Sequence, residues 1–467
     1  MKLGHECGLF GVHGDPEAVA MVYHGLQVLQ HRGQEGAGIA STWGGVIRHH
    51  AAPGLVTQAF SDPAVLERIR NPIAIGHVRY ATTGGSLDPT NVQPLLARFA
   101  GGPVALAHNG DLTNKAALRA ELEAAGALFQ STMDSETVLH LLARSGETEV
   151  EQGLRRVLPR LEGAYCLLML VSGKLVALRD PLGFRPLYLA RRGRAWMVAS
   201  EDAAFHLWDG IEDVREIEPG EMVVIDERGP TSLRFAAPRA RIARCIFETI
   251  YFARPDSHLF GRNVHLTRVA FGHRLAREHP VPADIVSAVP DSGNSASIGY
   301  SRESGIPLDR AFIKNHYVGR TFITPGQEAR QVKVRMKLAA VREVVEGKRV
   351  VVVDDSIIRG TTSSSRIAAL RQAGAREVHL RISCPPTRHP CFFGIDFPTP
   401  DELIAANMSV EETARFVGAD TLGYLSEEGL VACVEGARDT WCLACFDGDY
   451  PAPTPGDFLS GDSPPPA

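Results

Sequence analysis

Hydrophobic positions are arranged differently in the two halves of the chain. From Cys7 to about Phe235, short apolar runs alternate with glycine-containing turns, and only a few stretches have helical spacing. From about Cys245 to Leu430, apolar strands alternate with helical segments, which is typical of the βαβ units of a parallel sheet. We therefore predict an α+β domain followed by an α/β domain. The predicted strands are 7–12, 72–77, 104–108, 164–171, 174–177, 285–289 and 349–353, and the predicted helices of the first half are 16–29, 114–125 and 135–143.

The length of 467 residues also favours two domains, because single hydrophobic cores rarely grow that large. A connection that carries proline and arginine, 229–244, separates the halves, and we predict domains at 7–235 and 236–449. The remaining tail, 450–467, is rich in proline and glycine and is predicted to be disordered.

Composition limits the classes of function. Apolar residues make up 44% of the chain and charged residues 22%, as in soluble globular proteins. The formal net charge of −5, without a dominant basic run, gives no reason to expect nucleic-acid binding. No apolar run approaches the length of a membrane span, and the first residues lack an apolar signal core, so we expect a cytoplasmic protein. Eight cysteines in such a chain favour thiol chemistry or metal ligation over structural disulfides.

The most informative stretch follows the four valines Val350–Val353, which predict a strand buried on both faces. Asp354 and Asp355 stand where this strand should end, and a polar loop with Gly360 leads to a helical segment at 363–373. Backbone N–H groups and hydroxyls near a helix start suit a phosphate, whereas the two carboxylates suit sugar hydroxyls or a Mg²⁺-linked pyrophosphate. A phosphorylated ribose satisfies both groups; the plain alternative is an exposed acidic turn. A Walker-type ATP site is disfavoured, because no G-x-x-x-x-G-K-[ST] motif occurs.

This stretch resembles the phosphoribosyl-pyrophosphate (PRPP) loop of the type I phosphoribosyltransferases. Residues 289–293 end another apolar strand and should form the second wall of that site, with backbone donors for pyrophosphate. The basic and aromatic segment 314–322 is either a solvated loop or, as we prefer, a lid that excludes water. The predicted magnesium ligands are Ser292, Asp354 and Asp355, and the predicted PRPP-binding residues are Asp291, Ser292, Gly293, Lys314, Asp354, Asp355, Ser356, Gly360, Thr361 and Thr362.

The first half contains Cys7 just before an apolar run, where a free cysteine more often packs as a small hydrophobe. Four polar motifs change that interpretation: 30–35 (QHRGQE), 76–84 (GHVRYATTG), 108–110 (HNG) and 133–137 (MDSET). In order and identity they resemble the glutaminase domain of the N-terminal-nucleophile (Ntn) amidotransferases, which implies an αββα sandwich. The Cys-His-Glu class of amidotransferases would need a G-x-C-x-G elbow, which is missing from the sequence.

The Ntn resemblance implies a role for each of these residues. Residues 1–6 would be a propeptide, and Cys7, once terminal, would be the nucleophile with its own α-amine as base. Asn109 and Gly110 would form the oxyanion hole. The glutamine-binding residues would be Arg79 for the α-carboxylate, Asp134 for the α-ammonium, and Arg32 in the same pocket.

A C-x-x-C motif, Cys442 to Cys445, could by itself bind zinc, form a redox pair or do neither, and spacing does not choose its partners. The whole chain, however, resembles the glutamine PRPP amidotransferase family, and one Bacillus-like branch of that family holds a [4Fe–4S] cluster. The sequence contexts of that branch match Cys245, Cys391, Cys442 and Cys445, which could also hold Zn²⁺. One departure is Ala339, where family members often carry asparagine.

The resemblance implies a pentosyltransferase of purine biosynthesis that moves nitrogen from glutamine to PRPP with Mg²⁺. It also implies a homotetramer inhibited by purine nucleotides such as AMP and GMP. Two alternatives remain open at this point: a PRPP-sensing regulator, and another Ntn amidotransferase that makes amino sugars or asparagine. A regulator would need a DNA-binding module, and the other amidotransferases would lack the Asp354-Asp355 loop.

Overall fold

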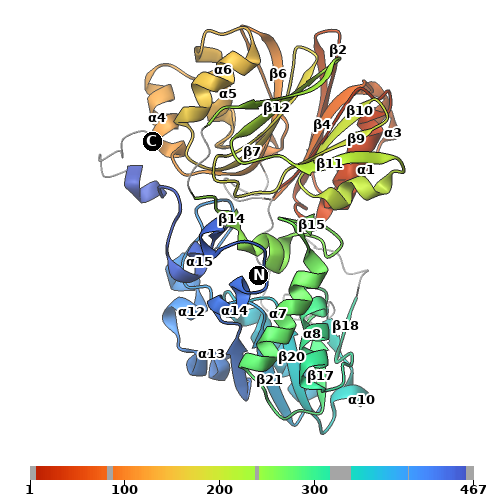
Figure 1. The fold of residues 1–467 in the computed structure, drawn as a ribbon, viewed down its shortest axis with the longest axis vertical. Helices are drawn as coiled ribbons and strands as arrows, with labels where there is room; N and C mark the ends of the chain where they lie inside the picture. Colours follow the sequence, from red (N-terminus) through yellow and green to blue (C-terminus); the bar gives the residue numbers. More distant parts are fainter. Residues whose placement is uncertain (1–6, 81–87, 237–240, 316–337, 398, 459–467) are drawn as a thin grey trace.

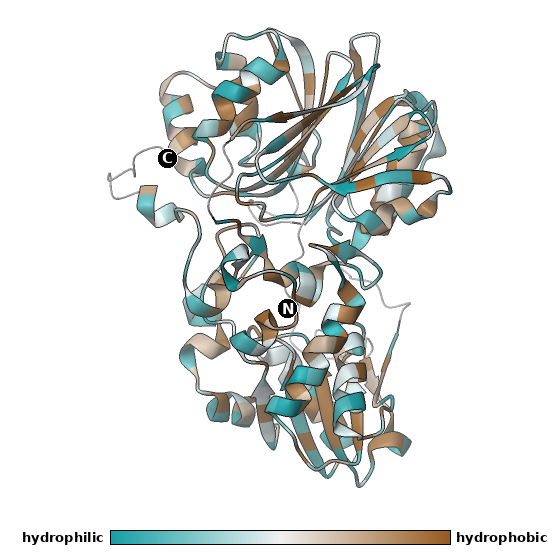
Figure 2. Cartoon of the chain, viewed as in Figure 1, coloured by the Kyte–Doolittle hydropathy of each residue, from teal (hydrophilic) through white to brown (hydrophobic). Residues whose placement is uncertain are grey.

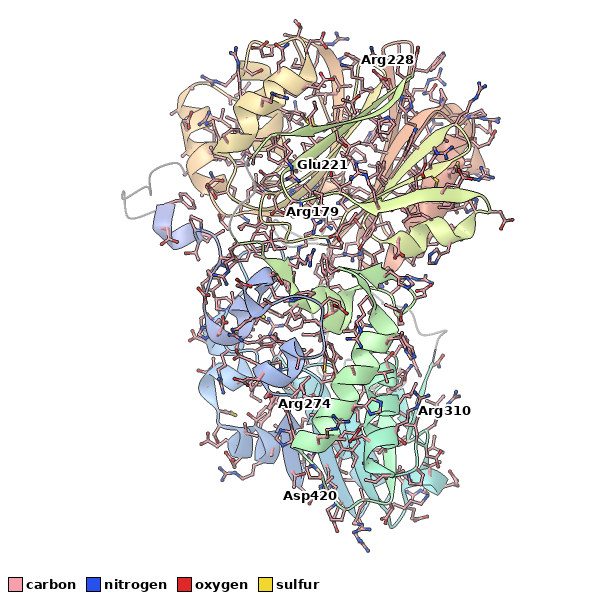
Figure 3. All side chains as sticks on the ribbon, viewed as in Figure 1. Arg179, Glu221, Arg228, Arg274, Arg310 and Asp420 are labelled. Carbon is pink, nitrogen blue, oxygen red and sulfur yellow. The ribbon has the colours of Figure 1, made fainter. Side chains whose placement is uncertain are left out.

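The computed structural model describes residues 7–80, 88–236, 241–315, 338–397 and 399–458. Two lobes are stacked along the long axis of the molecule, with the amino-terminal half above and the carboxy-terminal half below (Figure 1). The strands of both lobes are largely hydrophobic, and much of the helical surface that faces outward is hydrophilic (Figure 2). Charged side chains extend from both ends, as Arg228 and Asp420 illustrate, whereas Arg179 lies nearer the junction (Figure 3). No helix in the described part of the chain is long and apolar enough to cross a membrane.

Two antiparallel sheets pack face to face in the amino-terminal half, as the αββα prediction required. Leu9 and Ile75 of one sheet meet Ala105 and Leu168 of the other in a shared apolar cluster. Helix α1 (Ala18–Val28) packs on the outer face of the first sheet. In order across that sheet, the strands are β11 (Ile211–Glu216), β9 (Tyr188–Arg192), β10 (Ala195–Ala199), β1 (Gly8–His13), β4 (Ile73–Arg79), β2 (Gly36–Trp43) and β3 (Val46–Pro53).

The second sheet is covered by a group of three helices, whose leucines and valines bury its outer face. Successive side chains of a strand point to opposite faces of the sheet. Each strand therefore contributes residues both to the apolar layer between the two sheets and to the layer beneath the helices. The helices are α4 (Lys115–Ala124), α5 (Glu136–Arg144) and α6 (Val150–Val157), and the strands in order are β13 (Gly229–Arg234), β12 (Glu221–Asp226), β8 (Lys174–Arg179), β7 (Gly163–Val171), β6 (Gly102–Leu112) and β5 (Leu95–Phe99). The short helices α2 (Val56–Ala59) and α3 (Pro63–Arg68) complete this half.

The carboxy-terminal half is built on a four-stranded parallel sheet, which confirms the predicted α/β class. The valines Val350–Val353 are completely or almost completely buried at its centre, and each contributes about 1.5–3 kcal/mol. Helices α7 and α8 cross closely because Gly272 and Gly299 leave no side chain between them. The order of strands is β17 (Ile285–Ala288), β20 (Arg349–Asp354), β21 (Glu377–Ile382) and β22 (Thr421–Tyr424), and the main helices are α7 (Val264–Glu278), α8 (Asn294–Ser304), α11 (Thr361–Gln372) and α13 (Val410–Val417).

Short elements surround the sheet and the junction. Strand β14 (Arg244–Cys245) pairs in parallel with β23 (Trp441–Cys442), so the end of the second half is tied to its beginning. The junction also contains a one-turn π-helix, η5 (Glu248–Phe252). The other pieces are β15 (His258–Leu259), β16 (Arg262–Asn263), β18 (Phe312–Lys314), β19 (Leu338–Ala340), α10 (Arg342–Val345), α12 (Ile404–Asn407), α14 (Glu427–Val431) and α15 (Ala444–Asp447).

Two predicted segments differ from the structure. The connection at 229–244 is not a linker throughout, because its first six residues form β13, an edge strand on which Pro230 is tolerated. The predicted disordered tail is packed at its start: Tyr450 Oη donates to the carbonyl of Pro390 at 2.8 Å, and Ala452 is buried. A proline-rich composition did not prevent this segment from being anchored through its aromatic residue.

Candidate functional sites

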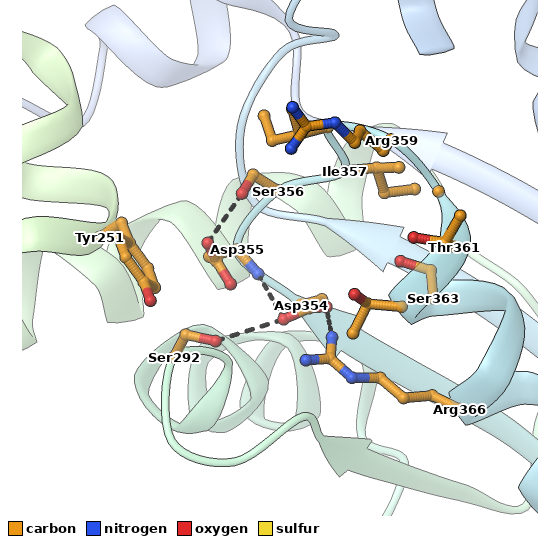
Figure 4. Close-up of a pocket in the computed structure, with 13 residues that line it drawn as sticks. Tyr251, Ser292, Asp354, Asp355, Ser356, Ile357, Arg359, Thr361, Ser363 and Arg366 are labelled. Atoms are coloured by element: carbon orange, nitrogen blue, oxygen red, sulfur yellow. Dashed lines mark hydrogen bonds and ion pairs between the residues drawn. The ribbon is translucent and has the colours of Figure 1, made fainter. Parts of the chain in front are cut away.

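A polar pocket lies at the carboxyl end of β20, where the sequence placed it (Figure 4). Asp354 is the last residue of the strand and is 2% exposed, because the valines before it draw the chain into the core. Its Oδ1 accepts from the hydroxyl of Ser292 at 3.3 Å and from the backbone N–H of Asp355 at 3.1 Å, while its Oδ2 is paired with Arg366. Burial raises the pKa of Asp354 to about 7, the charge of Asp355 adds to this, and Arg366 opposes it.

The loop after the strand brings the predicted phosphate donors to the same pocket. Gly360 has φ 75°, and a Cβ there would lie 2.6 Å from the side chain of Ile404, so the turn into α11 requires glycine. Thr361 and Thr362 begin the helix and line the pocket, and Ser356 Oγ donates to Asp355 Oδ2 at 2.8 Å. The carboxylates of Asp354 and Asp355 thus face the start of α11 across one small pocket. A sugar phosphate carries hydroxyls that suit the carboxylates and a phosphate that suits the helix start.

Of the predicted second wall, only Ser292 lines the pocket; Asp291 and Gly293 belong to the same turn but are not among the lining residues. A Cβ on Gly293 would lie 2.2 Å from the carbonyl oxygen of Val353, so glycine lets this turn pack against β20. Lys314, the first residue of the predicted lid, forms an ion pair with Asp291 of this turn and does not itself line the pocket. Residues 316–322 of that segment lie outside the described residues, and Ala339 lies in β19.

Several pocket residues were missed by sequence reasoning: Tyr251, Ile357, Ile358, Arg359, Ser363 and Arg366. Arg366 lies one turn into α11, and Tyr251 comes from η5 at the junction, about a hundred residues earlier in the chain. Helical spacing could have placed Arg366 on the face of Thr362, four residues before it, but not in contact with Asp354. No local signal pointed to Tyr251.

The second candidate site surrounds Cys7 in the amino-terminal half. Cys7 is 8% exposed, and its Sγ is 4.0 Å from the carbonyl oxygen of Tyr80. Burial raises the pKa of the thiol to about 11; the contact with the Tyr80 carbonyl and the charge of Arg79 lower it in part. Such a thiol needs a base to act as a nucleophile at neutral pH. Residues 1–6, the predicted propeptide, lie outside the described residues.

Asn109 and Gly110 follow the apolar part of β6 but lie inside that strand, opposite Cys166 and Tyr165, and not in a turn after residue 108 as the predicted strand 104–108 implied. The Nδ2 of Asn109 is buried and has no hydrogen-bond partner among the described residues. Gly110 has φ 144°, and a Cβ there would lie 2.0 Å from the carbonyl oxygen of Ala164, so no side chain fits. A buried donor without a partner costs about 1–3 kcal/mol, and native structures keep such groups mainly for a ligand or a reaction.

Asp134 is buried beside a histidine that the sequence analysis did not single out. Its Oδ1 lies 3.3 Å from His108 Nδ1, and its Oδ2 accepts from the backbone N–H of Leu112 at 2.9 Å. Burial would raise the pKa of Asp134, but the charge of His108 and these bonds hold it well below its usual range. The pKa of His108 is raised despite burial, because Asp134 faces it. The carboxylate therefore stays ionised, as an ammonium ligand must.

Arg79 and Arg32, the two predicted arginines, differ in their surroundings. Arg79 ends β4, is 1% exposed and acts electrostatically on Cys7. Arg32 is also buried, but its guanidinium binds two carboxylates, those of Glu201 and Glu248. A glutamine-binding role for Arg32 stays a prediction, and the structure gives its charge other partners.

The four predicted cluster cysteines come from three segments and lie near one another. Cys245 and Cys442 are directly opposed in the β14–β23 pair, and the charges of Cys245 and Cys391 both act on Cys442 and Cys445. Burial raises the pKa of all four thiols, and their mutual charge raises it further in Cys391, Cys442 and Cys445. Among the described residues, no group of three or more His, Cys, Asp or Glu side chains has the arrangement of a formed metal site.

Comparisons with known proteins find a matching domain family and relatives that cover nearly the whole chain. The family model described as a glutamine amidotransferase domain matches residues 77–207. An amidophosphoribosyltransferase of Bacillus subtilis (strain 168) is 50% identical over 454 residues, which cover 96% of this chain and 94% of the relative. Another, from Methanothermobacter thermautotrophicus, is 47% identical over 458 residues and covers 97% and 96%. A solved structure, described as glutamine PRPP amidotransferase from B. subtilis complexed with ADP and GMP, aligns with a TM-score of 0.89 and 49% identity over 96% of this chain and 98% of that one.

Proposed function

The chain belongs to the amidophosphoribosyltransferase family, and from this premise we propose how its residues divide the reaction. The enzyme is a pentosyltransferase of purine biosynthesis that converts PRPP, L-glutamine and water to 5-phosphoribosylamine, L-glutamate and pyrophosphate. Similarity over nearly the whole length of the relatives favours this activity over a PRPP-sensing regulator or another Ntn amidotransferase. We assign glutamine hydrolysis to residues 7–235 and phosphoribosyl transfer to residues 236–449.

In the glutaminase half, Cys7 is the nucleophile after removal of residues 1–6. Because burial raises the pKa of its thiol to about 11, the proton must leave to a nearby base, and the freed α-amine of the same residue, with an ordinary pKa of about 7.7–8.0, can accept it. The Nδ2 of Asn109 and the backbone N–H of Gly110 hold the oxyanion. Arg79 binds the α-carboxylate of glutamine, and Asp134 its α-ammonium.

In the phosphoribosyl half, the pocket at the end of β20 holds PRPP. Residues 360–362 bind the 5′-phosphate through backbone N–H groups and hydroxyls, Asp354 and Asp355 bind the ribose hydroxyls, and the turn at 291–293 binds pyrophosphate. The observation that carries this proposal is the Asp354 carboxylate, buried at the end of a strand beside Asp355 and opposite a helix start.

The oxygen atoms of Ser292, Asp354 and Asp355 fit Mg²⁺, which prefers hard oxygen ligands. The hydroxyl of Ser292 lies 3.3 Å from Asp354 Oδ1, so two candidate ligands from different loops are already adjacent. When bound, Mg²⁺ stabilises the charge of departing pyrophosphate. Arg366 holds Asp354 in place through its ion pair.

Ammonia released beside Cys7 passes to this pocket without meeting solvent, and its appearance in the medium during full turnover would contradict that passage.

The cysteines Cys245, Cys391, Cys442 and Cys445 fit a [4Fe–4S] cluster, as in the Bacillus-like branch. The charge of Arg185 favours the thiolate form of Cys245, Cys391 and Cys442. Four thiolates are the ligand set of such a cluster. Backbone N–H groups approach the sulfur atoms, such as that of Phe393 at 3.4 Å from Cys391 Sγ, and these favour the thiolate form. The cluster would join the end of the second half of the chain to its beginning. Iron and sulfide in anaerobically purified enzyme, with zinc missing, support this assignment; zinc alone would refute it.

Regulation and assembly follow the family. Because the B. subtilis structure is described as a complex with ADP and GMP, we propose that purine nucleotides such as AMP and GMP bind and inhibit this enzyme. We also propose a cytoplasmic homotetramer. Glutamine-dependent synthesis assayed with each nucleotide, and the mass in solution, test these two points.

The deciding experiment combines mass analysis of the amino terminus with an assay of pyrophosphate release. We expect processed enzyme that begins at Cys7 and uses either glutamine or ammonia. Cys7→Ala should lose glutamine use and keep ammonia use. Cys433→Ala is the matched control, because Cys433 is also a buried free cysteine, and it should keep both activities. Retained glutaminase activity in Cys7→Ala would refute the assignment.

A further inference from the structure

Arg366 lines the PRPP pocket from α11 (Figure 4). It lies four residues after Thr362, so the two side chains share one face of the helix. The side chain of Arg366 is only 13% exposed. The donors of so deeply buried a cation normally all have partners, because an unsatisfied buried donor is costly. The partners of Arg366 therefore indicate what this side of the pocket binds.

The guanidinium of Arg366 uses one nitrogen on the protein. Nη1 donates to Asp354 Oδ2, although a guanidinium carries five N–H donors in a planar fork. In the same half of the chain, Arg268 and Arg359 each donate through both Nε and Nη2, to two carbonyls and to one carboxylate respectively. In Arg366 these two atoms make no such bond within the described part of the chain and are not enclosed by protein, so this edge of the fork is left for a ligand.

The two oxygens of Asp354 separate the two ends of the pocket. Oδ1 accepts from the hydroxyl of Ser292 at 3.3 Å, and Oδ2 is paired with Arg366 (Figure 4). Ser292 belongs to the turn that we propose for pyrophosphate, whereas Arg366 belongs to the helix whose first residues we propose for the 5′-phosphate. The remaining donors of Arg366 therefore lie on the 5′-phosphate side.

The charge of the pocket also calls for a cation at that side. A phosphate monoester carries about −1.5 to −2 at neutral pH, and Asp354 and Asp355 repel it. The start of α11 offers only about half a positive charge. A guanidinium supplies a full charge, and its planar fork binds two phosphate oxygens at once. Arg366 therefore offsets the carboxylates that the ribose hydroxyls need.

We propose that Arg366 is a further PRPP-binding residue, which bridges the Asp354 carboxylate and the 5′-phosphate of the substrate. This inference rests on the proposed function and deepens it. Nη1 stays on Asp354, while Nε and Nη2 donate to two oxygens of the 5′-phosphate. The arginine thus does more than hold Asp354: it fixes the distance between the carboxylates that bind the ribose hydroxyls and the phosphate at the other end of the sugar.

The test compares Arg366→Met with wild-type enzyme, since methionine keeps much of the length and removes the charge and the fork. Titration calorimetry with Mg²⁺ measures the Kd of ribose 5-phosphate and of pyrophosphate, which represent the two ends of PRPP. We expect the Kd of ribose 5-phosphate to rise by about tenfold or more, as for the loss of charge-assisted hydrogen bonds, and that of pyrophosphate to stay unchanged. In ammonia-dependent synthesis, the KM for PRPP should rise by a similar factor, and kcat should change less.

Arg371→Met is the matched control, because Arg371 lies on the same helix and pairs with Asp420 at 2.5 Å, away from the pocket. It should leave both Kd values unchanged. An unchanged Kd for ribose 5-phosphate in Arg366→Met would overturn the inference. Equal losses for both compounds would overturn it too, because a residue that only holds Asp354 would weaken both through the shared Mg²⁺.

Arg366→Lys keeps a positive charge beside Asp354 but lacks the planar fork. It should weaken ribose 5-phosphate binding as well, by less than Arg366→Met. Should Arg366→Met fail to fold, an unchanged Kd for ribose 5-phosphate in Arg366→Lys overturns the inference instead. A wild-type enzyme that binds neither ribose 5-phosphate nor PRPP would contradict the proposed function itself, whereas equal affinities in the wild type and the Arg366 variants would contradict this inference alone.

Discussion

The proposed oxyanion hole can be tested by changing Asn109 to alanine. Losing one such donor costs about 10²–10³ in kcat, or about 2.7–4 kcal/mol of transition-state stabilisation. Stability should respond differently. The Nδ2 of Asn109 has no partner among the described residues, so its removal relieves about 1–3 kcal/mol of unsatisfied desolvation. The small cavity left behind costs on the order of 1 kcal/mol. The free energy of unfolding should therefore stay the same or rise while glutaminase activity falls.

The assay is glutamate release with saturating PRPP and Mg²⁺, beside pyrophosphate release with ammonia, which should be unaffected. Asn114→Ala is the matched control: Asn114 is buried in the same half, but its amide donates to the carbonyl of Arg160 at 2.8 Å and accepts from the N–H of Glu162 at 3.2 Å. This control should lose stability and keep glutaminase activity. If Asn109→Ala is destabilised as much as Asn114→Ala and keeps its kcat, the oxyanion assignment is wrong.

Three other changes have definite expected outcomes. Burial, with the charge of Arg79, lowers the pKa of His77 from 6.5 to about 3. As the pH falls, the unfolded chain therefore takes up a proton on this histidine before the folded protein does. Between about pH 7.5 and pH 5 this difference costs about 2 kcal/mol of the free energy of unfolding. Urea unfolding should show that the free energy of unfolding lost over this pH interval is smaller by this amount in His77→Gln than in the wild type. An equal loss in the two proteins would contradict a lowered pKa of His77 as the cause. Gly394→Ala would place a methyl 3.1 Å from the backbone of Gly110 at φ 105°, and should lower glutamine use but not ammonia use; parallel losses would argue against contact with the oxyanion site. Gly360→Ala should weaken PRPP binding in titration calorimetry, because alanine disfavours φ 75°, and an unchanged Kd would refute a requirement for this turn.

The parts of the fold that depend on local pattern could be predicted from the sequence. The valines before Asp354 predict a buried strand whatever surrounds them, and a parallel sheet places its end at a binding edge. The same reasoning was wrong for Asn109 and Gly110: they follow an apolar run, but the strand continues past them to Leu112. Strand β13 was missed because it is a polar edge strand with a proline, and nothing in its pattern alternates clearly.

Contacts between distant segments could not be predicted. Arg32 stands in a polar loop that suggested a ligand pocket, yet its partners are more than 160 residues away, beyond what spacing can specify. Arg366 and Tyr251 reach the PRPP pocket only through tertiary packing. The cysteines were grouped by resemblance alone, and only the pairing of β14 with β23 gives a geometric reason for two of them to meet.

That pairing has a consequence for synthesis on the ribosome. Cys442 is made about 200 residues after its partner Cys245, and at about 5–20 residues per second this delay is on the order of 10–40 s. The sheets of the first half can close during this interval, since all their strands have already emerged. Cys245 and Cys391 instead wait as uncovered thiols until the last segment arrives. The nascent polypeptide is thus more exposed to oxidants than the finished enzyme. A ribosome that stalls near the end of the message would leave a folded first half beside a second half that lacks β23.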